Sequence, residues 1–582
     1  MIWTTSHLLD ETTSHINNLG IQVLKHTLLD QKSDDNLNFA VIGGGPKGMY
    51  AIDNFISEIN EQCINKKMNL YWFNKDSLFA AGPNYNPKQS ENLLINYCIG
   101  NLNAWKVNTE ERLCLTDWLR LHIDSTQISP YHYASRALVG CYLMDCCRKI
   151  IDDCPSNIRL HLIAEEIKSI AYKNKRLWLL NNQFESIILC TGHSFLSDDI
   201  ADKYKNNIFS AYPIENLDRV KSVQKIAIQG MGLSFIDTVI YISEGTIDDQ
   251  YPQFYPFSRT NLPMIPRRAE LNKNHNTFFF PEYWQDLISK SDIDFDKDFL
   301  PLMDKEIQMA YYSVVIKSTD IQTILHHIDL IRVEERFSLT NLLFPNKSLS
   351  DFQKENYTAW VSDYLQSHLE RCRLSFDENP LNNAIQMLSK FRPILEKCYE
   401  QGKLTSESHH RFDVHWYPAI SRICFGPPIA NVEKLIKLIS KGKLKFEFTE
   451  CPEVNLSSKT VVLKVNGKRI TCDALIYARI PRAANSKNNH PLFTNLIRQG
   501  LAIPFKNETY ATGGIAVNKE GLLLNKLKKS IALYAYGTPT EGCVLDNDTL
   551  SREAHDFSLN WVSHNITLLK STIPNSLHYV QR

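Results

Sequence analysis

The sequence lacks an excess of charge of either sign. Its 64 lysines and arginines balance 64 aspartates and glutamates, so the formal net charge is zero. Proteins that bind nucleic acids or anionic membrane surfaces carry a basic excess or a basic patch. We therefore expect neither a nucleic-acid partner nor a membrane partner, and the sequence does not indicate an oligomeric state.

Long apolar runs and paired cysteine motifs are also missing. No stretch reaches the roughly 18 apolar residues that a membrane-spanning helix needs, and residues 1–5 do not begin a basic and then apolar leader. None of the 14 cysteines belongs to a Cys-x-x-Cys pair. We expect reduced, mostly buried thiols, no metal site and a cytoplasmic location.

Glycine is absent between Gly245 and Gly402. The tight turns of a nucleotide-binding fold are thus missing there, and apolar residues recur at helical spacing, as in residues 383–391. We predict a helical insert over residues 281–410, with a kink at Pro393. Its arginines are expected on solvated faces, with substrate contact as the alternative: Arg371, Arg373 and Arg392.

The strongest motif that is present runs from Asn38 to Gly48. An apolar strand breaks into glycines and is followed by apolar residues at helical spacing. Gly43 would allow a sharp turn, Gly45 a close approach to a diphosphate beside Pro46, and Gly48 close helix packing. This pattern predicts a dinucleotide site, although glycine-rich turns after strands are also common without one.

A second strand is predicted over residues 70–73, followed by Asn74. Dinucleotide folds place a carboxylate at this point, roughly 20 residues past the last glycine, to hold the ribose hydroxyls. Asn74 lies 26 residues past Gly48 and offers an amide instead. We predict that Asn74 contacts the ribose, in a departure from the usual fingerprint.

Two later strands also end in small-residue turns. Residues 186–190 lead into Thr191 and Gly192, where an ordinary turn is the alternative. Residues 532–536 lead into a loop with Gly537, Thr540 and Gly542, and a helix is predicted from Leu550. Backbone amides at these turns could contact a cofactor.

A second fingerprint follows the strand at residues 225–229. Gly230 and Gly232 occupy the first two glycine positions, whereas Phe235 stands in the third, so we expect looser helix packing there. Asp237 is expected to interact with the helix dipole in the first turn. Arg259, 27 residues past Gly232, favours NADPH over NADH, with a surface arginine as the alternative.

With these residues in view, the chain from Asn38 onward resembles the flavoproteins that have two dinucleotide-binding domains. Within them it resembles the FAD/NAD(P)-binding family that includes urate hydroxylases and aspartate N-hydroxylases forming nitrosuccinate. The likeness rests on these motifs: Gly43 to Gly48, Gly82-x-x-Tyr85-x-Pro87 with Asn96, Thr191-Gly192-His193, Gly230-x-Gly232, Ser258-Arg259, Ser406-x-Ser408-His409, Gly426-Pro427-Pro428 and Gly537 to Gly542.

The resemblance implies an α/β protein with two Rossmann-like domains and a helical insert. We expect an extension with an accessory helix near residues 21–29, and five segments in all: 1–36 (extension), 37–200 (FAD-binding), 215–280 (NADPH-binding), 281–410 (insert) and 411–582 (returning FAD-binding part). Asn96 joins the residues expected to contact a cofactor.

The implied activity is that of an NADPH-dependent FAD monooxygenase acting on a small polar metabolite, in its most specific form by N-hydroxylation of an amino acid. NADPH would reduce FAD, and O2 would then supply the transferred oxygen. Arg411 and Arg422 are expected to bind substrate carboxylates. His409 and His410 could carry protons, or lie on the surface. An NAD(P)H oxidase or reductase without oxygen transfer, and a nucleotide-binding sensor, are the alternatives.

Overall fold

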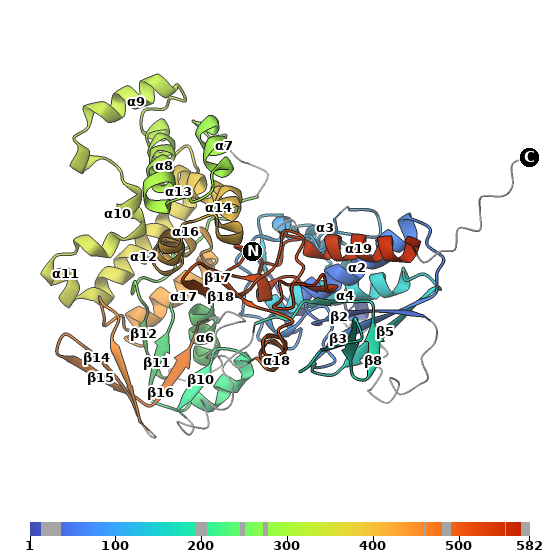
Figure 1. Ribbon diagram of the computed structural model, residues 1–582. Helices are drawn as coiled ribbons and strands as arrows, with labels where there is room; N and C mark the ends of the chain where they lie inside the picture. Colours follow the sequence, from blue (N-terminus) through green and yellow to red (C-terminus); the bar gives the residue numbers. More distant parts are fainter. Residues whose placement is uncertain are drawn as a thin grey trace, which may run out of the picture.

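Figure 1 shows a computed structural model of the protein. The structure describes residues 1–12, 36–106, 108–193, 207–244, 251–271, 278–457, 460–479, 490–552 and 555–571. The accessory helix expected near residues 21–29 lies outside these ranges.

The first large sheet is entirely parallel. Its strand order is β19 (Leu533–Ala535), β9 (Ser186–Leu189), β2 (Leu37–Ile42), β3 (Met68–Asn74) and β5 (Ile158–Ala164). Apolar residues dominate these strands because helices cover the sheet. The helices are α2 (Pro46–Glu61), α4 (Arg136–Asp152) and α19 (Phe557–Ser571). In Figure 1, α2 and α19 lie side by side, and the rings of Phe55 and Trp561 are 5.3 Å apart.

The second large sheet is also parallel, with the order β10 (Ile208–Ser210), β16 (Ala474–Tyr477), β11 (Lys225–Gln229) and β12 (Gln253–Phe257). It packs with α6 (Leu233–Ser243) and α17 (Ile429–Ser440). Residues 411–582 do not all belong to the FAD-binding part, in contrast to our expectation from the sequence. That boundary is wrong, because β16 and α17 complete the second domain.

A helical region separates β12 from β16. The break between α13 and α14 at Phe391 confirms the kink expected at Pro393. Helices continue past the expected end at residue 410. They are α7 (Pro281–Ser289), α8 (Leu300–Val315), α9 (Ile321–Leu330), α10 (Leu339–Leu343), α11 (Asp351–Glu355), α12 (Tyr357–Arg373), α13 (Pro380–Lys390), α14 (Arg392–Tyr399), α15 (Ser406–Arg411) and α16 (Tyr417–Cys424).

Small elements decorate these three parts. The strands are β1 (Ile2–Trp3), β4 (Tyr133–Ala134), β6 (Ala171–Lys173), β7 (Arg176–Leu179), β8 (Asn182–Phe184), β13 (Glu453–Leu456), β14 (Val461–Val465), β15 (Lys468–Cys472), β17 (Pro504–Asn507) and β18 (Tyr510–Ile515), and the remaining helices are α3 (Leu115–His122) and α18 (Pro491–Gln499).

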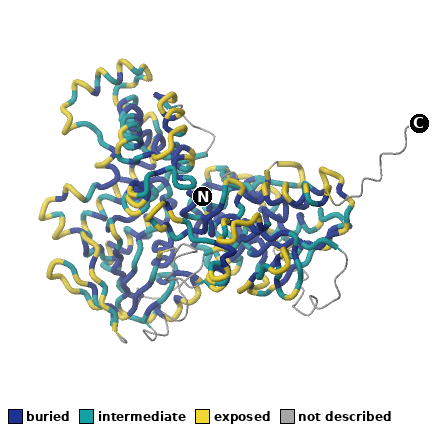
Figure 2. Tube along the Cα trace, viewed as in Figure 1, coloured by how far each residue is buried: buried dark blue, intermediate teal, exposed yellow. Residues whose placement is uncertain are grey.

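Buried residues run through both large sheets and the centre of the helical region, whereas exposed residues gather on outer helices such as α9 and α11 (Figure 2). Each large sheet has its own apolar core. The architecture confirms the predicted α/β class with two Rossmann-like domains and a helical insert. None of the helices that the structure describes is long and apolar enough to cross a membrane.

Candidate cofactor site

Four turns meet at one edge of the first sheet, because the carboxyl ends of parallel strands lie together. Ile42 of β2 is in register with Phe73 of β3 and Leu189 of β9, and Ala535 of β19 is in register with Leu189. These strand ends and the turns after them contain the predicted cofactor residues of the first domain, except Asn96. Ligands of open α/β sheets bind at this carboxyl edge.

The turn from β2 into α2 has one closed side and one open side. Gly43 has φ +123°, and a Cβ built on it would lie 2.2 Å from the Cys190 carbonyl oxygen. A Cβ on Gly48 would lie 1.9 Å from the Gly43 oxygen, so α2 packs against its own turn. Gly45, the N-cap of α2, has nothing within 4 Å of such a Cβ. Gly45 therefore presents the free face of the turn, where a diphosphate fits.

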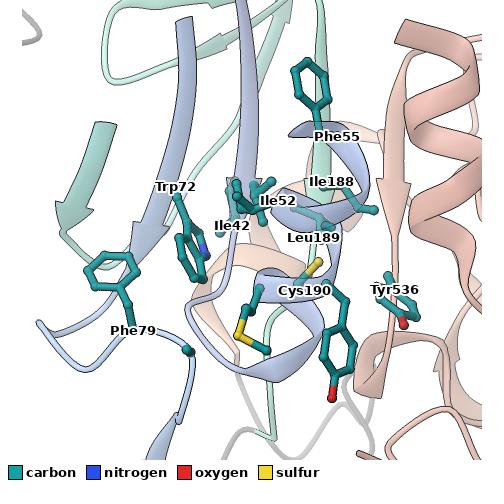
Figure 3. Close-up of a cluster of buried hydrophobic side chains, with 14 of the residues drawn as sticks. Ile42, Ile52, Phe55, Trp72, Phe79, Ile188, Leu189, Cys190 and Tyr536 are labelled. Atoms are coloured by element: carbon teal, nitrogen blue, oxygen red, sulfur yellow. The ribbon is translucent and has the colours of Figure 1, made fainter. Parts of the chain in front are cut away.

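Bulky side chains hold this turn in place. Trp72 Nε1 donates to the Gly43 oxygen at 2.9 Å, and the Trp72 ring packs edge-on against Phe79 at 5.0 Å. Figure 3 shows these two rings on one side of the turn, with Cys190 and Tyr536 on the other. The backbone of the turn is thus fixed before any ligand binds.

The Asn74 side chain, predicted to contact the ribose, also forms hydrogen bonds within the protein. Its Oδ1 accepts a hydrogen bond from the Gly44 amide at 3.2 Å, and its Nδ2 donates to Asp76 Oδ1 at 2.9 Å and to the Leu78 oxygen at 3.0 Å. The side chain ties the glycine turn to the next loop. One lone pair of Oδ1 remains for a ribose hydroxyl, and the ribose contact stays a prediction.

The turn after β9 carries buried polar atoms without partners among the described residues: Thr191 Oγ1 and His193 Nδ1. Asn547 Oδ1, in the loop after β19, is also buried without a hydrogen-bond partner among the described residues. Burial lowers the pKa of His193, and Asp548, whose Oδ2 lies 3.9 Å from Nε2, opposes that shift. Buried polar atoms normally have partners. These orphaned atoms, at the edge where Gly45 is open, fit a polar dinucleotide such as FAD.

Thr540 shapes the loop after β19 instead of facing outward. Its buried hydroxyl donates to the Gly537 oxygen and accepts from Asn547 Nδ2, both at 2.8 Å. Gly537 and Gly542 have φ of +83° and +98°. The helix predicted from Leu550 begins later, at Phe557.

Lys47 is a buried cation that was not among the residues predicted to contact a cofactor. Its Nζ donates to the Ser551 oxygen at 2.8 Å and lies 4.6 Å from the centre of the Tyr536 ring. Burial lowers the pKa of the ammonium to about 8, against the pull of Asp556 and Asp548. Lys47 links the first turn of α2 to the loop after β19. Its place between Pro46 and Gly48 was the available signal.

The second domain repeats the geometry of the first. Gly230 has φ +112°, and a Cβ built on it would lie 2.5 Å from the Ala478 carbonyl oxygen. The Cys190 carbonyl oxygen closes the same side of Gly43 in the first domain. Gly232 is the N-cap of α6 and is open, as Gly45 is. A nicotinamide dinucleotide fits this turn in the same way.

Arg259 and Arg479 flank the second turn. Phe257 and Tyr477 are both in register with Gln229, and each arginine follows its strand residue by two positions. Both side chains are exposed, and no carboxylate of the described chain pairs with either. Partial burial and then the neighbouring Arg479 lower the pKa of Arg259. Nothing near Arg479 in the sequence marks it, because only the pairing of β16 with β11 brings it to this turn.

Asp237 is the fifth residue of α6 and is buried, so the expected first-turn dipole role is wrong. Its Oδ2 lies 2.7 Å from Arg136 Nη2 and 2.5 Å from the Tyr212 hydroxyl. Arg136 begins α4 of the first domain. Phe235 is also fully buried, and its ring meets that of Phe446 at 6.5 Å, so it fills the space that we expected to be loosely packed.

Asn96 faces the helical region, where Nδ2 donates to the Phe425 oxygen at 3.2 Å. Nearby, Arg392 of α14 lies 2.9 Å from Glu396 and 3.1 Å from Asp546. Asp546 belongs to the loop after β19 and also accepts from the Tyr417 hydroxyl. Burial raises the pKa of Glu396 to about 7. This ion-pair network joins the helical region to the cofactor edge.

The structure does not support the two arginines expected at the substrate. Arg411 is 53% exposed and pairs with Asp296 at 3.2 Å. Arg422 is buried, but it donates to the Tyr364 hydroxyl and to the carbonyls of Leu342 and Leu343. Both Nη atoms are thus engaged, and with only Nε unpartnered the guanidinium has no two free donors side by side for a carboxylate.

The two histidines of α15 differ in burial. His409 is fully buried against the Tyr399 ring at 4.3 Å, whereas His410 is exposed. The surface alternative therefore holds for His410 only. Across the described ranges, no group of three metal-ligating side chains could hold a metal ion.

Comparison with known proteins decides the class. Residues 40–194 match a family described as FAD-NAD(P)-binding. Residues 40–194 are thus an FAD-NAD(P)-binding region. It is similar to the L-aspartate N-monooxygenase (nitrosuccinate-forming) of Streptomyces davaonensis, with 22% identity over 86% of this chain and 92% of the relative. It is also similar to a nitrosuccinic acid synthase of Aspergillus oryzae, with 21% identity over 86% and 88% of the two chains.

Among solved structures, the ornithine hydroxylase of Pseudomonas aeruginosa matches 91% of this flavoprotein and 100% of its own chain, with 11% identity and a TM-score of 0.45. The family match and the two curated relatives identify this flavoprotein as an FAD-dependent monooxygenase, as predicted. A small-molecule substrate and O2 follow from that class.

Proposed function

We propose that this flavoprotein uses NADPH and O2 to N-hydroxylate a small amino acid with two carboxylates. The observation that carries the proposal is the pair of open glycine turns, at Gly45 and Gly232, each leading into a helix. Two such turns serve one flavin and one nicotinamide dinucleotide. The names of the two curated relatives support an acidic amino acid of the aspartate type.

The reaction balances as a monooxygenation. One amine N–H of the substrate becomes N–OH, the second oxygen atom of O2 leaves as water, and NADPH supplies two electrons. FAD, when bound, supplies the chemistry that couples NADPH oxidation to O2. The protein supplies binding, orientation and shielding from water.

The residues divide between the two dinucleotides. The free face of Gly45 and the amide end of α2 would hold the FAD diphosphate, with Thr191 and His193 completing that edge. Gly232 would hold the NADPH diphosphate, with Arg259 at the ribose 2′-phosphate. A guanidinium suits a phosphate because it donates two parallel hydrogen bonds.

Product analysis tests this proposal. The FAD-loaded protein is incubated with NADPH, air and single amino acids, and three quantities are measured: NADPH oxidised, hydrogen peroxide formed and hydroxylamine formed. We expect hydroxylamine from an acidic amino acid in proportion to NADPH. Hydrogen peroxide as the sole product with every amino acid would favour an oxidase, and failure to bind FAD would favour a sensor.

A further inference from the structure

Arg267 is held in a fixed place between the second domain and the helical region. Its backbone amide donates to the Pro427 oxygen at 2.9 Å. A Cβ on Gly426 would lie 1.9 Å from the Ile265 oxygen, so the two segments touch through backbone. The Tyr133 hydroxyl donates to the Arg267 oxygen at 3.5 Å. Two other parts of the chain, the Gly426–Pro427 segment and Tyr133, therefore fix this residue.

The side chain of Arg267 is a cation without a carboxylate. Within the described part of the chain, Arg267 forms no ion pair with a carboxylate. Its Nη1 is buried without a hydrogen-bond partner, while the Tyr97 side chain is a hydrogen-bond partner of the guanidinium. The guanidinium lies 4.4 Å from the centre of the Tyr97 ring. A buried charge is costly unless it is paired. By contrast, the buried Arg371 donates to His368, Asn382 and the Pro266 oxygen.

The surroundings connect Arg267 to the cofactor edge. Tyr97 follows Asn96, whose amide binds the Phe425 oxygen. Arg392 lies near Tyr97 and forms ion pairs with Glu396 and Asp546. Because Asp546 belongs to the loop after β19, its pair with Arg392 connects the region to the cofactor edge. Arg392 already has two carboxylate partners, whereas no carboxylate of the described chain forms an ion pair with Arg267.

We propose that Arg267 binds a carboxylate of the substrate, with its guanidinium plane supported by the Tyr97 ring. This inference rests on the proposed function and names the part of the site that recognises the acidic group. A guanidinium lying on an aromatic face keeps its outer edge for two-point recognition of a carboxylate. The ligand class is a small dicarboxylate, and the amine is the part that must reach the flavin.

The test measures binding apart from turnover. Succinate, a dicarboxylate without an amine, and L-aspartate are titrated by calorimetry into the FAD-loaded enzyme and into Arg267→Gln and Arg267→Lys. Arg268→Gln is the matched control, because Arg268 points to Leu374 and the Phe376 ring. We expect at least tenfold weaker binding of both ligands in Arg267→Gln, a smaller loss in Arg267→Lys and no change in the control.

Two further readouts separate recognition from structure. Anaerobic reduction of the flavin by NADPH should be unchanged in both Arg267 variants, since neither alters a dinucleotide turn. Ligand-free Arg267→Gln should melt no lower than the parent, because the substitution removes an unpaired buried charge. If Arg267→Gln does not fold, Arg267→Lys decides: equal affinity for succinate in a folded Arg267→Lys overturns the inference.

The outcomes also separate this inference from the proposed function. If the parent enzyme binds no dicarboxylate, the proposed substrate class fails. If the parent binds succinate and L-aspartate and both Arg267 variants bind them equally well, Arg267 is not the carboxylate ligand, although the proposed function stands.

Discussion

Arg136 Nη2 lies 2.7 Å from Asp237 Oδ2, in a buried ion pair that joins α4 of the first dinucleotide-binding domain to α6 of the second. The Tyr212 hydroxyl contacts both side chains, at 2.7 Å from Arg136 Nη1 and 2.5 Å from Asp237. Burial raises the pKa of Asp237, while Arg136 opposes that shift. The two dinucleotide turns are therefore held relative to each other by a desolvated polar contact.

Removing one partner of this pair should be strongly destabilising. Asp237→Asn would leave the Arg136 charge buried and uncompensated, at a cost of about 3–5 kcal/mol in the free energy of unfolding. Denaturant unfolding of the FAD-loaded protein measures it. The control is Arg148→Gln, which breaks two partly exposed pairs, with Asp145 and with Asp152, and should cost less than about 1 kcal/mol per pair. Equal effects of the two substitutions would contradict a buried interdomain contact.

Alanine at the two open glycines should separate the two cofactors. A Cβ added at Gly45 or Gly232 would have no neighbouring atom within 4 Å, and neither glycine has a positive φ. Both Gly45→Ala and Gly232→Ala should therefore fold. The added methyl group would occupy the face predicted for a diphosphate. Gly45→Ala should lose FAD during purification, whereas Gly232→Ala should keep FAD and bind NADPH more weakly. FAD content and NADPH titration check this, and loss of FAD in Gly232→Ala would refute the assignment.

The two arginines beside Gly230 should differ in effect. Arg259→Gln should reduce the preference for NADPH over NADH, because we place Arg259 at the 2′-phosphate. Arg479 follows the strand equivalent to β9 and stands where Thr191 stands in the first domain, so Arg479→Gln should weaken both nucleotides. Binding of NADP⁺ and NAD⁺ to the oxidised enzyme measures the difference. Arg469→Gln, on exposed β15, serves as control.

His161 should make the protein acid-sensitive. It lies on β5 with its ring stacked on Tyr71 at 4.5 Å, and burial, then Arg159, lowers its pKa to about 4. Because the folded-state pKa lies below the usual 6.5, this contribution to stability is complete above pH 6.5 and is lost as pH falls toward 4. The free energy of unfolding should therefore fall less between pH 7 and pH 5 in His161→Phe than in the parent, as denaturant unfolding at the two pH values would show. The exposed His326, replaced by Asn, should leave the parent's pH dependence unchanged.

The sequence predicted the parts of the site that depend on local pattern. Gly43 and Gly230 follow apolar strands directly, and Gly48 lies in the first turn of the next helix. A strand, a tight turn and a helix entrance are all encoded within about ten residues. The break near Pro393 was predicted for the same reason, since proline acts on its own helix.

Features that depend on distant partners could not be predicted in this way. Asp237 appeared to be a dipole partner until the fold brought Arg136 beside it. Strand β16 reads like any buried strand, and only its register with β11 assigns it to the second domain. Arg422 and Arg267 look equivalent in the sequence, yet both Nη atoms of Arg422 donate hydrogen bonds and only its Nε has no partner, whereas Arg267 keeps Nη1 without one. Burial and pairing of charges arise from the whole fold.

Oxygen transfer is the central claim, and labelled O2 tests it most directly. The FAD-loaded enzyme is given NADPH, L-aspartate and isotopically heavy O2, and the amino-acid product is analysed by mass spectrometry. The account predicts an N-hydroxylated product that carries the heavy oxygen, with NADPH consumed in proportion. Unchanged L-aspartate, with all of the heavy oxygen recovered as hydrogen peroxide, would contradict the account.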